Sequence, residues 1–136
     1  MLAPPPPLWS YRYNVQDADN AAAGLGVPHL FEAAAVFGPD SIAGGSPPSY
    51  YSYNAPIVPL VMDYWISFVK SLDPNPHRNA AAPRWEPWRS GPAGGAGAGG
   101  RRRLVFETGN LTMEDVPADE VDRCLFWLSL TNVTEQ

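Results

Sequence analysis

The clearest pattern of apolar residues along the chain predicts one long helix over residues 57–72. Within it, apolar residues recur every three or four positions and form a continuous stripe on one face. The stripe consists of Ile57, Val61, Tyr64, Trp65, Phe68 and Leu72. Prolines are tolerated in the first turn of a helix, and the proline-rich segment 73–76 ends this one. An aromatic stripe of this kind is typical of a helix that packs on a core, not of a cofactor site.

Two short strands and a second helix are also predicted. Apolar and polar residues alternate over residues 9–15, which is the period of a strand with one apolar face, and residues 104–106 form another β-favouring run. Residues 16–23 and 40–54 are predicted as loops, the second anchored by its tyrosines. A C-terminal helix follows residue 117, with acidic residues in its opening turns. Its expected buried stripe consists of Val121, Cys124, Leu125 and Leu128.

A turn stiffened by proline places a histidine directly before a short apolar segment. Gly26 and Pro28 favour the turn, and residues 30–36 favour a helix that Gly38 stops. The imidazole of His29 titrates near neutral pH and therefore suits proton transfer, which makes it the candidate catalytic group. On these residues alone, an ordinary loop histidine is the alternative.

Composition and charge narrow the possible functions. A chain of 136 residues can form one modest domain, and its net charge of −5 argues against a nucleic-acid partner. No apolar run is long enough to predict a membrane span, and the first residues lack the pattern of a signal peptide. The 16 prolines and 12 glycines predict long irregular connections, among them a flexible Gly/Ala/Arg-rich loop over residues 91–103. Its three arginines are interpreted as solvated loop charge.

Cysteine, histidine and asparagine residues suggest few further sites. Cys124 is the only cysteine, so an internal disulfide is impossible. His29, His77 and Cys124 lack the spacing of metal ligands, and neither a metal nor another cofactor is predicted. Asn110 and Asn132 each open an Asn-x-Thr sequon, which makes both glycosylation candidates and hints at a secretory route.

The histidine segment resembles that of the type-B carboxylesterase/lipase family, the α/β-hydrolases that include the cholinesterases, and is closest to its fungal members. The resemblance rests on Gly26-Val27-Pro28-His29, Glu32, Val36-Phe37-Gly38, Tyr64-Trp65-Ile66-Ser67-Phe68, Asp73-Pro74-Asn75, Trp85-Glu86-Pro87-Trp88 and the C-terminal segment 123–127. It implies that His29 is the histidine of a Ser-His-Glu triad and that Glu32 is a buried acid supporting it. In cholinesterases a cysteine at the place of Cys124 pairs with one upstream of the histidine segment, and any such partner would precede Met1.

The resemblance covers residues 9–130 but only about the last quarter of the family's usual length. It implies an α/β fold class, with residues 1–136 as the C-terminal fragment of a type-B carboxylesterase domain that carries the last strands and helices of an incomplete sheet. In α/β-hydrolases the serine and the acid precede the histidine, and this sequence contains no G-x-S-x-G. Both groups are therefore expected upstream, and the chain alone is expected to be inactive. Because two strands do not make a stable sheet, we also expect a large exposed apolar surface.

The function implied by the resemblance is hydrolysis of a small-molecule carboxylic ester through a serine acyl-enzyme, with the remainder of the hydrolase domain missing here. Full-length members of the family are expected to be secreted. The alternatives are a non-catalytic cholinesterase-like binding or adhesion domain, a decayed gene remnant, and an unrelated free-standing small protein.

Overall fold

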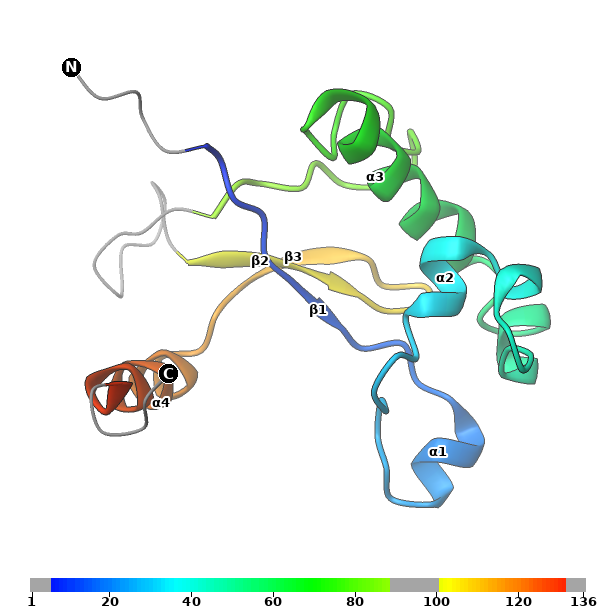
Figure 1. Ribbon diagram of the computed structural model, residues 1–136, viewed down its shortest axis with the longest axis horizontal. Helices are drawn as coiled ribbons and strands as arrows, with labels where there is room; N and C mark the ends of the chain where they lie inside the picture. The colour runs from blue at the N-terminus through cyan, green and yellow to red at the C-terminus, as the bar shows by residue number, and fades with distance from the viewer. Residues whose placement is uncertain (1–5, 89–100, 132–136) are drawn as a thin grey trace.

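The computed structural model describes residues 6–88 and 101–131 and shows a small α/β unit built on one three-stranded sheet (Figure 1). The strands lie in the order β1 (Tyr11–Tyr13), β2 (Arg102–Phe106) and β3 (Thr112–Asp115). Strands β1 and β2 run parallel, and β2 and β3 form an antiparallel hairpin. The parallel register places Tyr13 beside Phe106, so that residues far apart in the sequence share the centre of the sheet.

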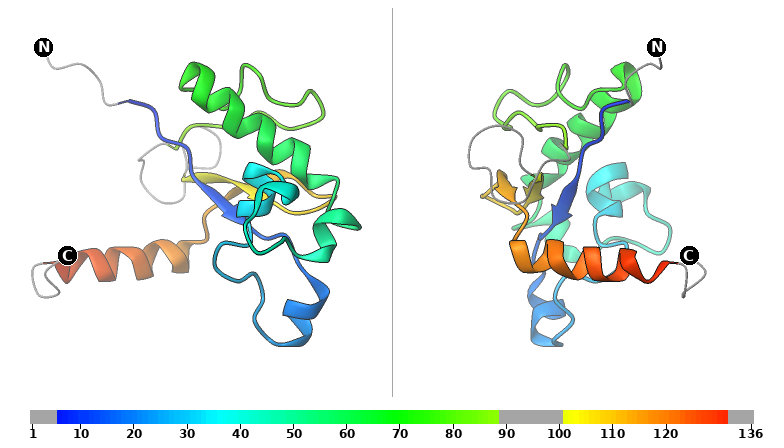
Figure 2. Two further views of the ribbon diagram at one scale, coloured as in Figure 1. Left: turned by 45° about the vertical axis from the view of Figure 1, so that its right-hand side comes forward. Right: turned by 90° about the vertical axis from the view of Figure 1, so that its left-hand side faces the viewer.

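Four α-helices and two short 3₁₀ turns complete the described part of the chain. They are α1 (Ala18–Ala22), α2 (Ala33–Phe37), η1 (Pro39–Ser41), η2 (Pro48–Tyr51), α3 (Ile57–Ser71) and α4 (Ala118–Ser129). Helix α2 packs against α3, whereas α4 lies apart from both, beyond the other side of the sheet (Figures 1 and 2). The core therefore forms between the sheet, α2 and α3.

Aromatic rings fill that core, and Phe106 stands at its centre. Its ring centre lies 5.7 Å from those of Tyr11 and Trp85 and 5.9 Å from that of Tyr64. These pairs are edge-to-face, an arrangement that adds attraction beyond the burial of area. Phe106 is fully buried, so strand β2 is fixed against α3 by side-chain packing as well as by its neighbouring strands.

The long helix is confirmed, with α3 running from Ile57 to Ser71. It ends where Leu72 adopts a left-handed conformation with φ +56° and donates its N–H to the carbonyl of Phe68 at 2.7 Å. The first part of the predicted stripe is buried, but Phe68 is half exposed and Leu72 is 74% exposed. Within the described residues this end of the stripe is covered only in part, by the ring of Trp9, whose centre lies 5.9 Å from that of Phe68.

One helix and one strand were not predicted, and one predicted strand is shorter than expected. The strand expected over residues 9–15 is the three-residue β1. Residues 16–23, predicted as a loop, contain α1, because Asp17 caps its start by accepting the backbone N–H groups of Asp19 and Asn20, each at 3.1 Å. Strand β3 was not predicted, because its four residues show no alternation of apolar and polar side chains.

The prediction of a surface loop over residues 40–54 is wrong in part. The segment contains η1 and η2, and both Tyr50 and Asn54 are buried. The Asn54 side chain donates to the carbonyl of Gln16 at 2.8 Å and accepts the hydroxyl of Thr108 at 2.7 Å. Tyr50 and Asn54 are buried because these polar partners replace water, and the predicted role of the tyrosines as anchors is confirmed for Tyr50.

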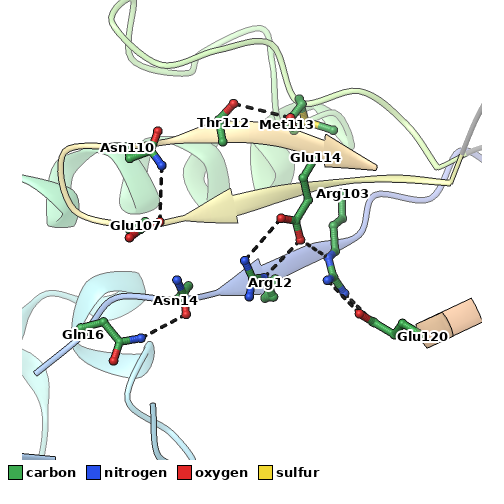
Figure 3. Close-up of polar contacts among 10 residues, drawn as sticks. All are labelled: Arg12, Asn14, Gln16, Arg103, Glu107, Asn110, Thr112, Met113, Glu114 and Glu120. Atoms are coloured by element: carbon green, nitrogen blue, oxygen red, sulfur yellow. Dashed lines mark hydrogen bonds and ion pairs between the residues drawn. The ribbon is translucent and has the colours of Figure 1, made fainter. Parts of the chain in front are cut away.

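The arginine run is not solvated loop charge. Residues 91–100 of the predicted flexible loop lie outside the described residues, but Arg102 and Arg103 already belong to β2. The Arg103 side chain is 11% exposed, with Nε 2.7 Å from Glu114 on β3 and Nη1 2.6 Å from Glu120 on α4 (Figure 3). Hydrogen bonds from Arg103 lower the pKa of Glu120. The Arg103 side chain can be largely removed from water because two carboxylates neutralise its charge.

Helix α4 does not bury the predicted stripe within the described residues. Val121 is buried, but Cys124, Leu125 and Leu128 are exposed, as is Trp127 at 64%. The expectation of exposed apolar surface is therefore confirmed for this helix and for the end of α3. The expectation of only two strands is corrected by β3. Among the described residues, no helix is long and apolar enough to cross a membrane.

Replacing Arg103 with Met should loosen α4, because Met keeps the apolar stem but removes the cation that pairs with Glu120, while Glu114 keeps Arg12, 3.2 Å away. We expect a loss of about 1–2 kcal/mol in the free energy of unfolding, reduced from the value for a fully buried pair because the Glu120 side chain is 34% exposed. Urea titration at neutral pH measures this loss. Arg123→Gln, which breaks the exposed pair with Asp119, is the matched control and should change stability little.

The difference in the free energy of unfolding between the parent and Arg103→Met should depend on pH. Since the folded-state pKa of Glu120 is lowered, its contribution to stability is present above the ordinary carboxyl pKa of 4.5 and is lost as pH falls. The difference between the parent and Arg103→Met should narrow below that pH. A difference that stays constant to low pH would contradict the ion-pair explanation.

Candidate functional site

His29 lies at the corner of a tight turn between α1 and α2. The backbone N–H of Phe31 donates to the carbonyl of Pro28 at 3.2 Å, so His29 and Leu30 are the two central residues of a four-residue turn. Leu30 has φ +64° and Gly26, at the entry to the segment, has φ +63°. The His29 side chain is exposed. The predicted turn is thus confirmed, and its imidazole is accessible to another group.

Leu30 holds a backbone conformation that L-residues with a Cβ rarely adopt. Its side chain is 63% exposed, so burial does not compensate the cost of this conformation. Non-glycine residues in such conformations collect at active sites and binding loops, where the surrounding structure imposes them. The strain next to His29 therefore favours a functional turn over an ordinary loop.

A chain of hydrogen bonds fixes this turn to strand β1. The Tyr50 hydroxyl donates to the carbonyl of Phe31 at 2.7 Å and accepts the hydroxyl of Tyr13 at 2.8 Å. The Phe31 ring is buried and lies 5.0 Å from the ring of Tyr50. Burial raises the pKa of Tyr50 to about 12, and burial followed by the hydrogen bond to Tyr50 raises the pKa of Tyr13. Both hydroxyls therefore keep their protons at neutral pH.

Glu32 follows the turn and precedes α2, but its side chain does not cap that helix. The residue is half-buried. Its negative charge is a minor cause of the raised pKa values of Tyr13 and Tyr50, which follow mainly from burial. Its assignment as an acid supporting His29 stays a prediction.

The structure brings His29 and Glu32 onto one anchored segment, but it joins them by no hydrogen bond among the described residues. His77, the other histidine, lies after α3, where its backbone N–H donates to the hydroxyl of Ser67 at 3.0 Å. Over residues 6–88 and 101–131, no group of three or more His, Cys, Asp or Glu side chains could hold a metal ion.

A cavity of 240 Å³ lies between α3, the start of β1 with the residues before it, and the segment after α3, and neither His29 nor Glu32 lines it. Its walls are formed by Pro7, Leu8, Trp9, Tyr11, Tyr64, Trp65, Phe68, Pro74 and Trp85. Because its walls offer no group suited to proton transfer, we interpret this cavity as incomplete packing around the exposed end of α3.

Asn110 stands at the turn of the β2–β3 hairpin (Figure 3). Its residue is exposed, and its amide nitrogen lies 3.4 Å from a carboxylate oxygen of Glu107, a long contact. The next residue but one, Thr112, opens β3 and is also exposed. The other candidate, Asn132, lies outside the described residues. Only the first sequon therefore has a described setting, and it is an accessible one.

Sequence reasoning missed the two tyrosines that hold the histidine turn. Tyr13 was assigned to the apolar face of a strand, and Tyr50 to the anchoring of a loop. No spacing in the sequence connects either residue with Phe31, because the hydrogen bonds join positions 19 and 37 residues apart.

The strain at Leu30 can be measured by substitution. Leu30→Gly should raise the free energy of unfolding by at most about 1 kcal/mol, because relief of the left-handed conformation exceeds the entropy that glycine adds to the unfolded chain. Leu30→Val should lower it by about 1–2 kcal/mol, because a β-branched residue tolerates that conformation least. Leu25 is equally exposed in the same loop without a positive φ, so Leu25→Gly should not stabilise the chain. Equal effects of the two glycine substitutions in thermal unfolding would contradict strain at position 30.

Comparison with models of known protein families gives no match. Among solved structures, the chain is similar to the crystal structure of Aspergillus niger EstA, with a TM-score of 0.76 and 44% sequence identity. The match covers 91% of this chain and 22% of the EstA chain, so the sequence spans about a fifth of that protein's length.

At this identity the likeness extends to sequence as well as fold. It agrees with the resemblance carried by the histidine segment, and it makes the three-stranded sheet similar to part of an α/β-hydrolase. The chain is thus related to the fungal type-B carboxylesterases.

Proposed function

We propose that this chain provides the catalytic histidine of a serine carboxylic ester hydrolase, with His29 as the general base. One observation carries the proposal: an exposed imidazole stands on a strained turn that is anchored to a sheet strand, in a chain 44% identical to part of EstA. A general base must be accessible to its partners and yet held in place, and this turn combines both properties.

In the proposed reaction, His29 takes the proton of a serine hydroxyl while the serine oxygen attacks the ester carbonyl. The imidazolium then gives that proton to the departing alcohol, which leaves an acyl-enzyme. His29 next takes a proton from water, which attacks the acyl group, and the imidazolium then returns that proton to the serine oxygen as the bond to the acyl group breaks and the carboxylic acid leaves. The sequence contains no G-x-S-x-G motif, so we place the catalytic serine outside these 136 residues. We place the triad acid and the groups that hold the oxyanion there as well.

Glu32 is proposed to support His29 electrostatically. Glu32 lies on the same anchored segment and is half-buried. A negative charge near the imidazole stabilises the imidazolium that forms during attack. Glu32 lies one helical turn from His29, which leaves the triad acid itself to a separate loop.

A chimera tests the function directly. The whole 136-residue chain replaces the matched 22% of A. niger EstA, and hydrolysis of a short-chain p-nitrophenyl ester is measured. We expect an active chimera, and a fall in kcat of about 10⁴-fold or more with His29→Gln. The 136-residue chain by itself should give no turnover.

His77→Gln is the matched control, because it removes an exposed histidine that lies outside the proposed site. It should leave kcat unchanged. A folded chimera in which His29→Gln keeps its activity, or in which the two histidine variants lose it equally, would refute the role of His29.

We also propose a secretory route with N-glycosylation at Asn110, which rests on the exposed sequon at the hairpin turn. The whole chain, expressed behind a signal peptide in a eukaryotic host, should lose one glycan on Asn110→Gln and likewise on Thr112→Ala. Mobility before and after treatment with an N-glycosidase measures this, in an Asn132→Gln background that removes the other sequon. A chain that carries no glycan in that background would contradict the proposal.

A further inference from the structure

We propose that Tyr50 is a positioning residue for His29: its hydroxyl holds the turn that carries the imidazole and so sets the direction in which the histidine meets its nucleophile. The inference rests on the proposed function, in which His29 is the general base. It adds a residue from a segment that the sequence pattern assigned only to a loop.

Tyr50 contacts both the side chain and the backbone of Phe31. The Tyr50 ring packs on the Phe31 ring, with 5.0 Å between ring centres, and its hydroxyl donates to the Phe31 carbonyl at 2.7 Å. The N–H of Phe31 meanwhile closes the turn on Pro28 at 3.2 Å. Residue 31 is therefore fixed through its side chain, its carbonyl and its amide, and two of these three contacts come from Tyr50.

His29 has no comparable support of its own. Its side chain is exposed, and within the described residues it accepts and donates no hydrogen bond. The direction of the imidazole therefore depends on the backbone of the turn, and the next residue, Leu30, is strained. A strained turn relaxes when a restraint is removed, so loss of the hydrogen bond to Phe31 should let the turn and its imidazole move.

The second partner of Tyr50 connects the turn to the sheet. The Tyr13 hydroxyl lies 2.8 Å from that of Tyr50, and Tyr13 belongs to β1. Since the Tyr50 proton is given to Phe31, Tyr13 must donate to Tyr50. Tyr50 is 1% exposed, so water does not replace either bond when it is broken. The histidine turn is thereby fixed relative to a strand end, where a separate catalytic group can be placed reproducibly.

Tyr64 provides a matched control within the same chain. It is fully buried like Tyr50, and its hydroxyl also donates to a backbone carbonyl, that of Pro83. Burial raises the pKa of each tyrosine to about 12. Tyr64 belongs to α3 and makes no hydrogen bond to the histidine segment among the described residues. The two Phe variants thus remove the same chemical group from similar surroundings.

The first arm of the test uses the active EstA chimera. Tyr50→Phe should lower kcat by about 10- to 100-fold with KM within about twofold, because misplacing a catalytic group by about 1 Å costs on this order. It should slow labelling of the serine by a fluorophosphonate by a similar factor, since that step also needs the base. Tyr64→Phe should leave both rates unchanged. Tyr13→Phe, which keeps the bond to Phe31, should give a smaller loss than Tyr50→Phe.

The second arm uses the whole 136-residue chain without any activity. Hydrogen exchange should become about tenfold faster at the Phe31 amide in Tyr50→Phe, because the amide closes the turn that has lost its anchor. The same amide should be unaffected in Tyr64→Phe.

The outcomes separate the two proposals. An inactive wild-type chimera together with faster Phe31 exchange in Tyr50→Phe would refute the proposed function and leave Tyr50 as the anchor of the turn. An active chimera in which Tyr50→Phe and Tyr64→Phe have equal kcat would overturn the positioning role and leave the function standing. Should Tyr50→Phe fail to fold, Tyr13→Phe decides: unchanged kcat and unchanged exchange would overturn the inference.

Discussion

The hydrogen bond from the Tyr50 hydroxyl to the Phe31 carbonyl is the constraint on which the candidate site depends. The turn at His29 is short and strained, and of its four residues, 28–31, only Phe31 has a buried side chain. Through Tyr50 and Tyr13 it is nevertheless connected to the sheet. A buried hydroxyl whose partners are fixed is well suited to this task, because breaking the bond leaves a polar group without water.

The sheet and α3 supply the rigid support behind that bond. Phe106 packs against Tyr11, Tyr64 and Trp85, so β1 and β2 are held to α3 by aromatic contacts. The apolar side chains of these elements are not covered on all sides, since the end of α3 and most of α4 expose apolar side chains within the described residues. These side chains expose more apolar surface than scattered single residues would. Such exposure agrees with a chain that matches only 22% of the EstA chain.

Charge, not apolar packing, connects α4 with the sheet. Arg103 on β2 reaches Glu114 on the neighbouring strand and Glu120 on the helix, while only Val121 of the expected apolar stripe is buried. Ion pairs that are partly exposed contribute modestly, so α4 is held less firmly than α2 or α3. The firm half of the molecule is therefore the half that carries His29.

The sequence by itself determined the elements whose cause is local. Helical periodicity defines α3, a glycine ends α2, and proline with glycine makes the His29 turn, because each of these follows from residues within a few positions of one another. The motif around His29 and Glu32 also pointed to the family. Only the tertiary structure decided that residues 40–54 are partly buried, that Arg103 is paired, and that Tyr50 holds Phe31. Those outcomes depend on partners distant in sequence, and neither periodicity nor propensity carries information about which distant groups will meet.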